Sequence, residues 1–253
     1  MTPPLTSNPS ISTSSWFTSD NFLQTKDDVI RDFLRPFDQG YWSVMGGNLF
    51  AVQEITTDEI MTPSREGDWF DGGIHQRAHY HTWTPQDNYT SDMWTALFTG
   101  ISLATNSMED IQAIDAEKFG LTEAEKSNFI AQLRTLRAWF NLRALDLYRN
   151  IPIITKVKGE SGIPPQSTPQ ETFDFIEKEL QEAIPALPTV ESLGNNAIGQ
   201  WTQAGAAALL MRLYFNAGVY IGQEKYTECA GICEDIINGK YGAYSLEPRW
   251  DAP

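Results

Sequence analysis

Cysteine is scarce in this sequence, which has two cysteines among 253 residues. Cys229 and Cys233 are four positions apart, so a helix would place both on one face. A disulfide bond within one helical turn fits the required geometry poorly. We therefore expect two small, buried side chains at a contact between helices. Two cysteines neither require nor exclude an oxidising compartment.

Basic residues are also few. The chain has 18 lysines and arginines against 33 aspartates and glutamates, a formal net charge of −15. A nucleic-acid partner would require a clustered basic surface, so this balance argues against one. We interpret the acidic surface as one that keeps the protein in solution.

Long hydrophobic runs are missing as well. No stretch approaches the roughly 18 apolar residues of a membrane-spanning helix. Alternation of apolar and polar residues with a period of two is almost absent, which disfavours a fold rich in strands. The length suffices for one sizeable core or two small ones.

Helical periodicity runs through most of the chain. It predicts helices over 26–51 with an interruption at Pro36, and over 88–116, 122–148, 169–185, 202–218 and 225–238. The start of the helix at 122–148 carries a capping box, Thr122 with Glu125. The helix at 169–185 has Thr168 as N-cap and a proline at its first position.

The predicted helices form pairs, 88–116 with 122–148 and 169–185 with 202–218. This spacing predicts an all-α array of paired helices similar to tetratricopeptide repeats, with a long irregular region near its N-terminus. The W-x2-L-G-x2-Y signature of those repeats is absent. The helix at 225–238 has no partner in this scheme. Its predicted inward side chains are Tyr226, Cys229, Ala230, Cys233 and Ile237.

The chain divides into two regions. Residues 1–19 are rich in Pro, Ser and Thr, and we expect a mobile tail. Residues 20–253 are expected to form the helical domain, with a candidate ligand-binding loop at 52–86. A loop of this length in a compact domain is usually functional.

Several segments resemble the SusD/RagB family of outer-membrane glycan-binding lipoproteins of Bacteroidetes-type bacteria. DNFLQTKDDVIRDF (20–33) is similar to an early helix of the family, and DMWTALFTGISLATNSMEDI (92–111) to a helix that carries the family asparagine, here Asn106. AQLRTLRAWFNLRALDLYRNIPII (131–154) is similar to its L-R-A-x-x-Y/F…L-Y-G-x-V-P segment, but Arg149 replaces the usual glycine. Residues 200–215 and 225–246 resemble later repeat helices.

The resemblance implies a SusD-like fold and non-catalytic binding of oligosaccharide or polysaccharide, with no cofactor. It implies a surface-exposed place in the outer membrane through a lipid anchor that this sequence does not contain, and a TonB-dependent, SusC-like transporter as partner. Members of the family are much longer. We therefore expect this chain, which stops at EPRWDAP, to correspond to an N-terminal half, either a natural short form or a trimmed product.

The stretch SREGDWFDGGIHQRAHYHTW (64–83) combines the two side-chain types that recognise sugars. Aromatic faces cover the C–H face of a pyranose ring, and planar polar groups bind its hydroxyls. The resemblance implies glycan contacts in the same region. The candidates for stacking are Trp69, Phe70 and Trp83, and the candidates for hydrogen bonding are Arg65, Asp68, Asp71 and Arg77. Gly72 and Gly73 would permit a tight turn that presents the aromatic rings outward.

Tryptophan in a helical array is more often part of the core than of a binding surface. Trp94 and Trp139 lie on helical patterns, and we assign both to the core. Trp69 lies among glycine and acidic residues, which favours a binding role. Trp83 precedes Thr84 and Pro85 at the end of the loop, where it could equally be a buried anchor.

Three other functions compete with glycan binding. His75, His79 and His81 lie near acidic residues and could bind zinc or copper, although their spacing matches no established site. Six acidic residues at 54–71 could include a glycosidase pair, but nothing in the loop fixes their separation. A helical-repeat scaffold for a protein or peptide predicts instead that the 64–83 segment is buried. We predict no metal site and no enzyme.

Overall fold

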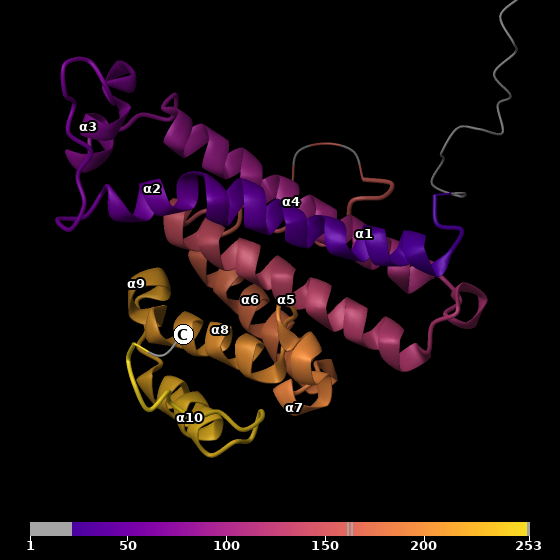
Figure 1. Cartoon of the computed structure of the whole chain (residues 1–253). Coiled ribbons are helices and arrows are strands. Elements are labelled where there is room, and N and C mark those ends of the chain that lie inside the picture. The colour runs from indigo at the N-terminus through magenta and orange to yellow at the C-terminus, as the bar shows by residue number, and fades with distance from the viewer. Residues whose placement is uncertain (1–21, 161, 163, 252–253) are drawn as a thin grey trace, which may run out of the picture.

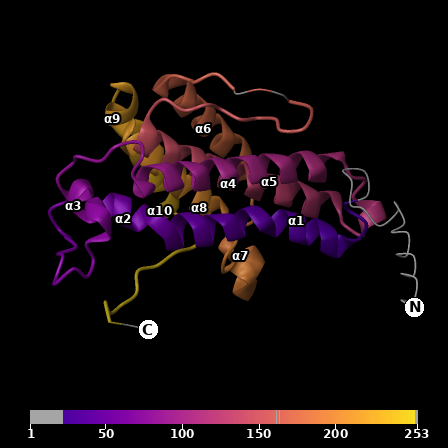
Figure 2. The same cartoon turned by 90° about the horizontal axis from the view of Figure 1, so that it is seen from above.

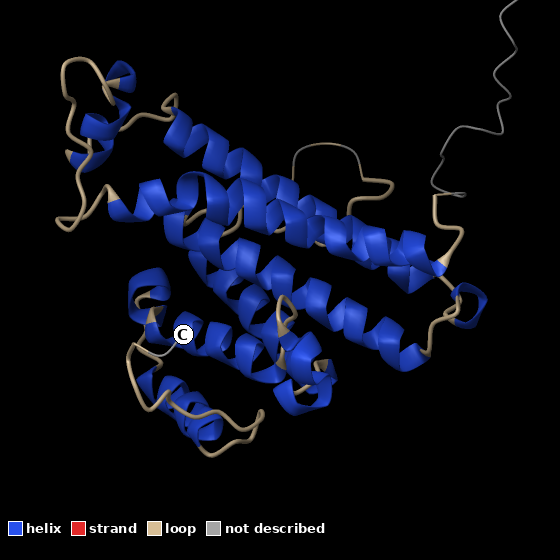
Figure 3. Cartoon of the chain, in the orientation of Figure 1, coloured by secondary structure: helices blue, strands red, loops and turns tan. Residues whose placement is uncertain are grey.

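The computed structural model describes residues 22–160, 162 and 164–251. The expected tail at 1–19 therefore lies outside the described residues. Over the described part the chain is helical and contains no strand, only isolated bridges (Figure 3). The predicted all-α class is confirmed. None of the helices in this part is long and apolar enough to cross a membrane.

The first rod of the structure runs from α1 (Lys26–Gln39) through a π-helical segment, Gly40–Asn48, into α2 (Leu49–Glu54). The interruption that we predicted at Pro36 is wrong, because α1 continues through this residue. Proline removes one main-chain donor from a helix and leaves the carbonyl four residues earlier without its partner. That carbonyl belongs to Asp32 and accepts a hydrogen bond from the Ser107 hydroxyl of a neighbouring helix, at 2.9 Å.

Two long antiparallel helices, α4 (Asn88–Ala113) and α5 (Glu123–Tyr148), lie beside this rod (Figures 1 and 2). The predicted capping box of Thr122 and Glu125 opens α5. The two helices approach closely at Gly100, where a Cβ atom would lie 2.7 Å from Cε2 of the buried Phe140 ring. Trp94 and Trp139 are half-buried and pack against this part of the core, in agreement with their assignment.

The second half of the described chain adds a further layer of helices. Its elements are α6 (Pro169–Ala183), the short α7 (Val190–Leu193), α8 (Gln203–Phe215), α9 (Ala217–Ile221) and α10 (Tyr226–Ile237). Thr168 caps α6 as predicted. A buried ion pair joins α5 to α6, with the Arg137 guanidinium donating two hydrogen bonds to Oε2 of Glu179 at 2.8 and 2.6 Å.

Two expectations about the C-terminal helices are wrong. The single helix predicted over 202–218 is divided at Asn216 into α8 and α9. The last helix, α10, does have a partner, because it packs against α8. Of its five predicted inward residues, Cys229 is buried and Cys233 packs beside it, whereas Tyr226, Ala230 and Ile237 are exposed. A stripe with helical period gives the spacing of apolar residues but does not ensure that the whole stripe is covered.

The turn after α5 shows why an arginine can replace the usual glycine. Arg149 has φ +62°, in the region that glycine favours. Its guanidinium donates hydrogen bonds to the main-chain oxygens of Val219 and Tyr220 in α9, at 3.2 and 3.3 Å. These contacts hold the strained turn against the last turn of α9 and connect the two halves of the array.

Candidate functional site

The predicted ligand-binding loop lies at one end of the helical array. It leaves α2 at Glu54, contains the 3-10 turn Asp71–Gly73 and the short α3 (Ile74–His79), and joins α4 at Asn88 (Figure 1). Gly72 and Gly73 have φ values of +64° and +80°, as the expected tight turn requires. The loop is thus more helical than the sequence indicated.

Two histidines fasten the loop to the end of the first rod. A ring nitrogen of His79 lies 3.3 Å from the main-chain oxygen of Ile55, and a ring nitrogen of His81 lies 2.7 Å from that of Thr56. Because a carbonyl oxygen only accepts, each of these nitrogens carries a hydrogen and donates it. These histidines therefore have a structural role in the loop.

Arg77 and Asp87 form the central tie between the loop and the start of α4. Nε of Arg77 donates to Oδ1 of Asp87 at 2.9 Å, a terminal nitrogen donates to the same oxygen, and the other terminal nitrogen donates to the Gly72 carbonyl at 2.7 Å. The Asp87 side chain also accepts from the Thr84 main chain. The hydrogen bond from Arg77, followed by the one from Thr84, lowers the pKa of Asp87 to about 2. Most donors of Arg77 are used within the loop.

His75 is buried and links two further parts of the loop. Its Nε2 lies 3.0 Å from Oδ2 of Asp71, and its Nδ1 lies 2.8 Å from the hydroxyl of Tyr89. The three histidines of the loop thus have separate partners. Within the described residues no three histidine, cysteine, aspartate or glutamate side chains converge on a point where a metal ion could bind.

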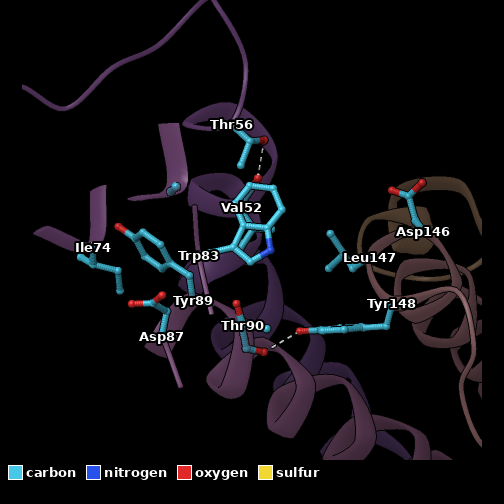
Figure 4. Close-up of a pocket in the computed structure, with 11 residues that line it drawn as sticks. Val52, Thr56, Ile74, Trp83, Asp87, Tyr89, Thr90, Asp146, Leu147 and Tyr148 are labelled. Carbon is cyan, nitrogen blue, oxygen red and sulfur yellow. Dashed lines mark hydrogen bonds between the residues drawn. The ribbon is translucent and has the colours of Figure 1, made fainter. Parts of the chain in front are cut away.

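A cavity of about 200 Å³ lies where the loop meets the helical array. Figure 4 shows the indole of Trp83 over this cavity, with Tyr89 on one side and Tyr148 below. The remaining lining residues are Val52, Thr56, Ile74, Ala78, Asp87, Thr90, Asp146 and Leu147. Trp83 is 47% exposed, so its ring forms a wall of the cavity and also faces solvent.

Tyr148 fixes the inner side of this cavity. Its hydroxyl donates to the main-chain oxygen of Thr90 at 2.6 Å, and burial raises its pKa to about 12. The phenol therefore stays protonated at physiological pH and keeps its ring in place. The cavity thus combines rigid aromatic walls with carboxylate and hydroxyl oxygens.

A second aromatic surface of the loop lies around Trp69, which is 65% exposed and has φ +61°. Trp69 and Arg65 line a shallow hollow of about 350 Å³, together with Met61, Thr62 and Pro63. The main chains of Arg65 and Asp68 exchange two hydrogen bonds, at 3.1 and 2.8 Å, which leaves both side chains exposed. Phe70 is also exposed.

The structure separates the predicted site residues into two groups. Arg65 and Trp69 line the shallow hollow, and Asp68 is joined to Arg65 through the main chain, while Trp83 lies at the cavity. The ring of His75 lies 6.2 Å from that of Trp69 and 5.7 Å from that of Tyr89, which lines the cavity.

Sequence reasoning missed Tyr89, Thr90 and Tyr148 as cavity residues. Tyr148 is the last residue of the helix predicted over 122–148, and an aromatic residue at that end was the available signal.

The arrangement can bind a ligand with apolar faces and many hydroxyl groups. The loop carboxylates are dispersed: Asp58, Glu59, Glu66, Asp68 and Asp71 are all exposed. A glycosidase needs two carboxyl groups at a fixed separation, one of them shielded from water. None of these five exposed carboxylates is shielded from water in this way.

Comparison with known proteins identifies the family of this chain. The SusD-like family, described as starch-binding and associating with the outer membrane, matches residues 24–215. The chain belongs to the SusD-like family. It is 26% identical to the starch-binding protein SusD of Bacteroides thetaiotaomicron over 192 aligned residues. The aligned region covers 76% of this chain and 32% of that protein.

Solved structures share the SusD-like fold. The surface glycan-binding protein A of Bacteroides uniformis superposes with a TM-score of 0.73 at 18% identity, covering 88% of this chain and 48% of the other. A laminarin-binding SusD-like protein gives a TM-score of 0.72 at 20% identity, covering 88% and 47%. This chain therefore spans less than half of these solved chains and about a third of the curated relative.

Proposed function

We propose that this SusD-like chain binds an oligosaccharide or polysaccharide at its loop without cleaving it. Trp83 and Trp69 supply stacking surfaces, with Phe70 beside Trp69. Arg65, Asp68 and Asp71 supply exposed groups for sugar hydroxyls, and Arg77 positions the loop through Asp87.

The exposed indole of Trp83 at the mouth of a cavity is the observation that carries this proposal. A pyranose ring has an apolar C–H face and a rim of hydroxyl groups. The indole matches the apolar face, and Thr90 and Asp146 offer oxygen atoms for the hydroxyl groups. A site of this kind, mostly apolar with a few placed polar groups, is typical of small-molecule recognition.

Exposure of the loop also distinguishes the candidate functions. A helical-repeat scaffold that binds protein predicted a buried 64–83 segment, but Trp69, Phe70 and Trp83 are 65%, 53% and 47% exposed. Their exposure favours a ligand that stacks on single rings. The dispersed carboxylates favour binding without hydrolysis.

The family description supports a place at the outer membrane, on the cell surface. We extend the proposal to delivery of the bound glycan to a TonB-dependent, SusC-like transporter, with a lipid anchor holding the protein at the membrane.

Affinity electrophoresis against starch, laminarin and a wider panel of plant, host and microbial polysaccharides tests the proposal. Trp83→Ala is expected to weaken binding at least tenfold, and Trp69→Ala to weaken it less, because its hollow is shallower. The matched control is Trp42→Ala, since Trp42 is 69% exposed on the π-helical segment outside the loop.

The proposed site is wrong if both loop variants bind as the unmodified protein does, or if Trp42→Ala weakens binding equally. Binding to no polysaccharide of the panel would contradict the function itself. Release of new reducing ends during the assay would show an enzyme.

A further inference from the structure

A groove starts near the predicted loop and runs along α4 in the direction that leads away from it. It is a hollow of about 560 Å³, and its lining residues are Trp94, Thr95, Phe98, Thr99, Ser102, Leu103, Asn106 and Val157. Ser102 and Val157 also line a neighbouring hollow of about 670 Å³, which includes Thr155 and Lys156 from the segment after α5. The two shared residues place this second hollow directly beside the groove, whose own wall consists of α4 residues and Val157.

This groove begins next to the cavity of Trp83. Tyr148 lines the cavity, and the edge of its ring meets that of Trp94, with centroids 5.0 Å apart at 87°. The next ring along α4 is Phe98, 4.3 Å from Trp94. A row of aromatic side chains thus leads from the cavity into the groove.

The polar groups of the groove are free to bind a ligand. Within the described residues, the hydroxyls of Thr99 and Ser102 make no hydrogen bond, and Asn106 uses only its Nδ2, which donates to Asp110 at 2.8 Å. The hydroxyl of Thr95 donates to the Ser91 carbonyl at 3.0 Å, so its oxygen can still accept. These groups lie on one face of α4 from Thr95 to Asn106, a rise of roughly 16 Å.

The chemistry of this face favours a carbohydrate over a peptide. An extended peptide binds best where main-chain groups are unpaired, as at a sheet edge. The groove wall along α4 is an α-helix, whose main-chain groups are paired internally through its interior. Hydroxyl and amide side chains that alternate with aromatic rings suit a chain of linked sugar rings.

We propose that the groove along α4 continues the glycan site, so that a chain whose one end lies under Trp83 extends past Trp94 and Phe98 toward Asn106. This inference rests on the proposed function and adds to it a preference for long, unbranched glycans. Each further ring bound in the groove increases affinity, whereas a short oligosaccharide that fills only the cavity gains nothing from it.

Calorimetric titration with the trimer and the octamer of maltooligosaccharides and of laminarioligosaccharides tests the groove. Thr99→Arg places a bulky charged side chain at an exposed position of the groove without touching the core. Gln112→Arg is the matched control, because Gln112 is exposed on the same helix outside the groove.

The unmodified protein is expected to bind the octamer at least about tenfold more tightly than the trimer, about 1.4 kcal/mol. A longer oligosaccharide also binds more tightly because any of several of its segments can occupy the cavity. The expected tenfold difference in affinity exceeds this statistical gain. Thr99→Arg is expected to remove most of this gain and to leave trimer binding unchanged, which also shows that the variant is folded. Gln112→Arg is expected to behave as the unmodified protein.

The groove proposal fails if the trimer binds and the octamer gains nothing, or if Thr99→Arg leaves octamer affinity unchanged. Those results would not contradict the site at Trp83. They would show that the groove does not bind the glycan and favour another partner for it, such as a peptide. If neither oligosaccharide of either series binds, the proposed function is contradicted for both α- and β-glucans, and the groove proposal falls with it.

Discussion

The Ser107 hydroxyl of α4 donates a hydrogen bond to the main-chain oxygen of Asp32 in α1, at 2.9 Å, and lies 3.1 Å from Oδ1 of the same residue. Pro36, one turn further along α1, has no N–H to offer to that oxygen. A side chain of a different helix therefore completes the hydrogen bonding of α1, and the rod passes through a proline without a break.

Ser107→Ala is expected to destabilise the fold by about 1–3 kcal/mol, because it leaves a buried carbonyl without a donor. Chemical denaturation measures this change. Ser102→Ala is the matched control, since Ser102 lies on the same helix and its hydroxyl has no partner among the described residues. Equal losses for the two variants would contradict the role assigned to Ser107.

Asp32→Asn is expected to stabilise the protein above neutral pH and to change little at about pH 4. Burial, and then the nearby Asp110 carboxylate, raise the pKa of Asp32 to about 6 from an ordinary 3.8. A raised pKa means that the native state favours the protonated carboxyl. The stability contribution is full below about pH 4 and is lost as the pH rises through 6.

The gain for Asp32→Asn at pH 8 is expected to be on the order of 1–3 kcal/mol, the range that a rise of about two pKa units gives. Urea denaturation at pH 4 and pH 8 measures it. A gain at pH 4 as large as at pH 8 would show that charge is not its cause.

The sequence predicted best those features that depend on neighbouring residues. The capping box of Thr122 and Glu125 was correct, because both partners lie within one turn. The helix through Pro36 was not predicted, since its missing donor is replaced from Ser107, 75 positions away from Asp32. The helical period of α10 likewise did not show which of its side chains would be covered by α8, because that contact also depends on another segment of the chain.

Gly100→Ala is expected to destabilise the protein by about 2 kcal/mol or more, because overpacking a rigid contact forces neighbouring atoms to move. The new Cβ would lie 2.7 Å from Cε2 of Phe140, whose side chain is fully buried between α4 and α5. Thermal or urea denaturation would detect this change as unfolding at a lower temperature or at a lower urea concentration.

Gly231→Ala is the control for Gly100→Ala. Gly231 lies inside α10 with no atom near its missing Cβ. It is expected to stabilise the protein by about 0.5–1 kcal/mol through helix propensity alone. If Gly100→Ala lowers the free energy of unfolding and Gly231→Ala raises it, steric contact is separated from helix propensity. Changes of the same sign would contradict the close approach of α4 and α5.

The candidate site was predictable in part, for a similar reason. Composition marked Trp69 and Trp83 as unusual, and both rings are exposed. The cavity itself is built from α2, the loop, α4 and the end of α5, so no single segment of the sequence contains its pattern. Arg77 was expected to face the ligand, but its pairing with Asp87 became visible only in the folded loop.

Arg77→Ala is expected to loosen the loop at acidic pH before the helical array unfolds. Arg77 is the main cause of the low pKa of Asp87, about 2. A lowered pKa contributes stability above the ordinary value near 4, and this contribution is lost as the pH falls toward 2. Without the guanidinium the carboxyl becomes protonated at a higher pH. The charged tie to Thr84 then weakens earlier than in the unmodified protein.

Limited digestion with pepsin at about pH 3 measures this difference, because the loop carries exposed aromatic residues such as Tyr80 that pepsin can cut once it opens. Arg77→Ala is expected to be cut within 74–87 several-fold faster than the unmodified protein. Arg31→Ala removes an ion pair of similar type with Asp28, but its arginine is 75% exposed, and such surface pairs contribute about 0–1 kcal/mol. This control should therefore be cut in the loop at the unmodified rate. Equal rates for all three proteins would mean that the histidine contacts to Ile55 and Thr56 hold the loop without help from Arg77.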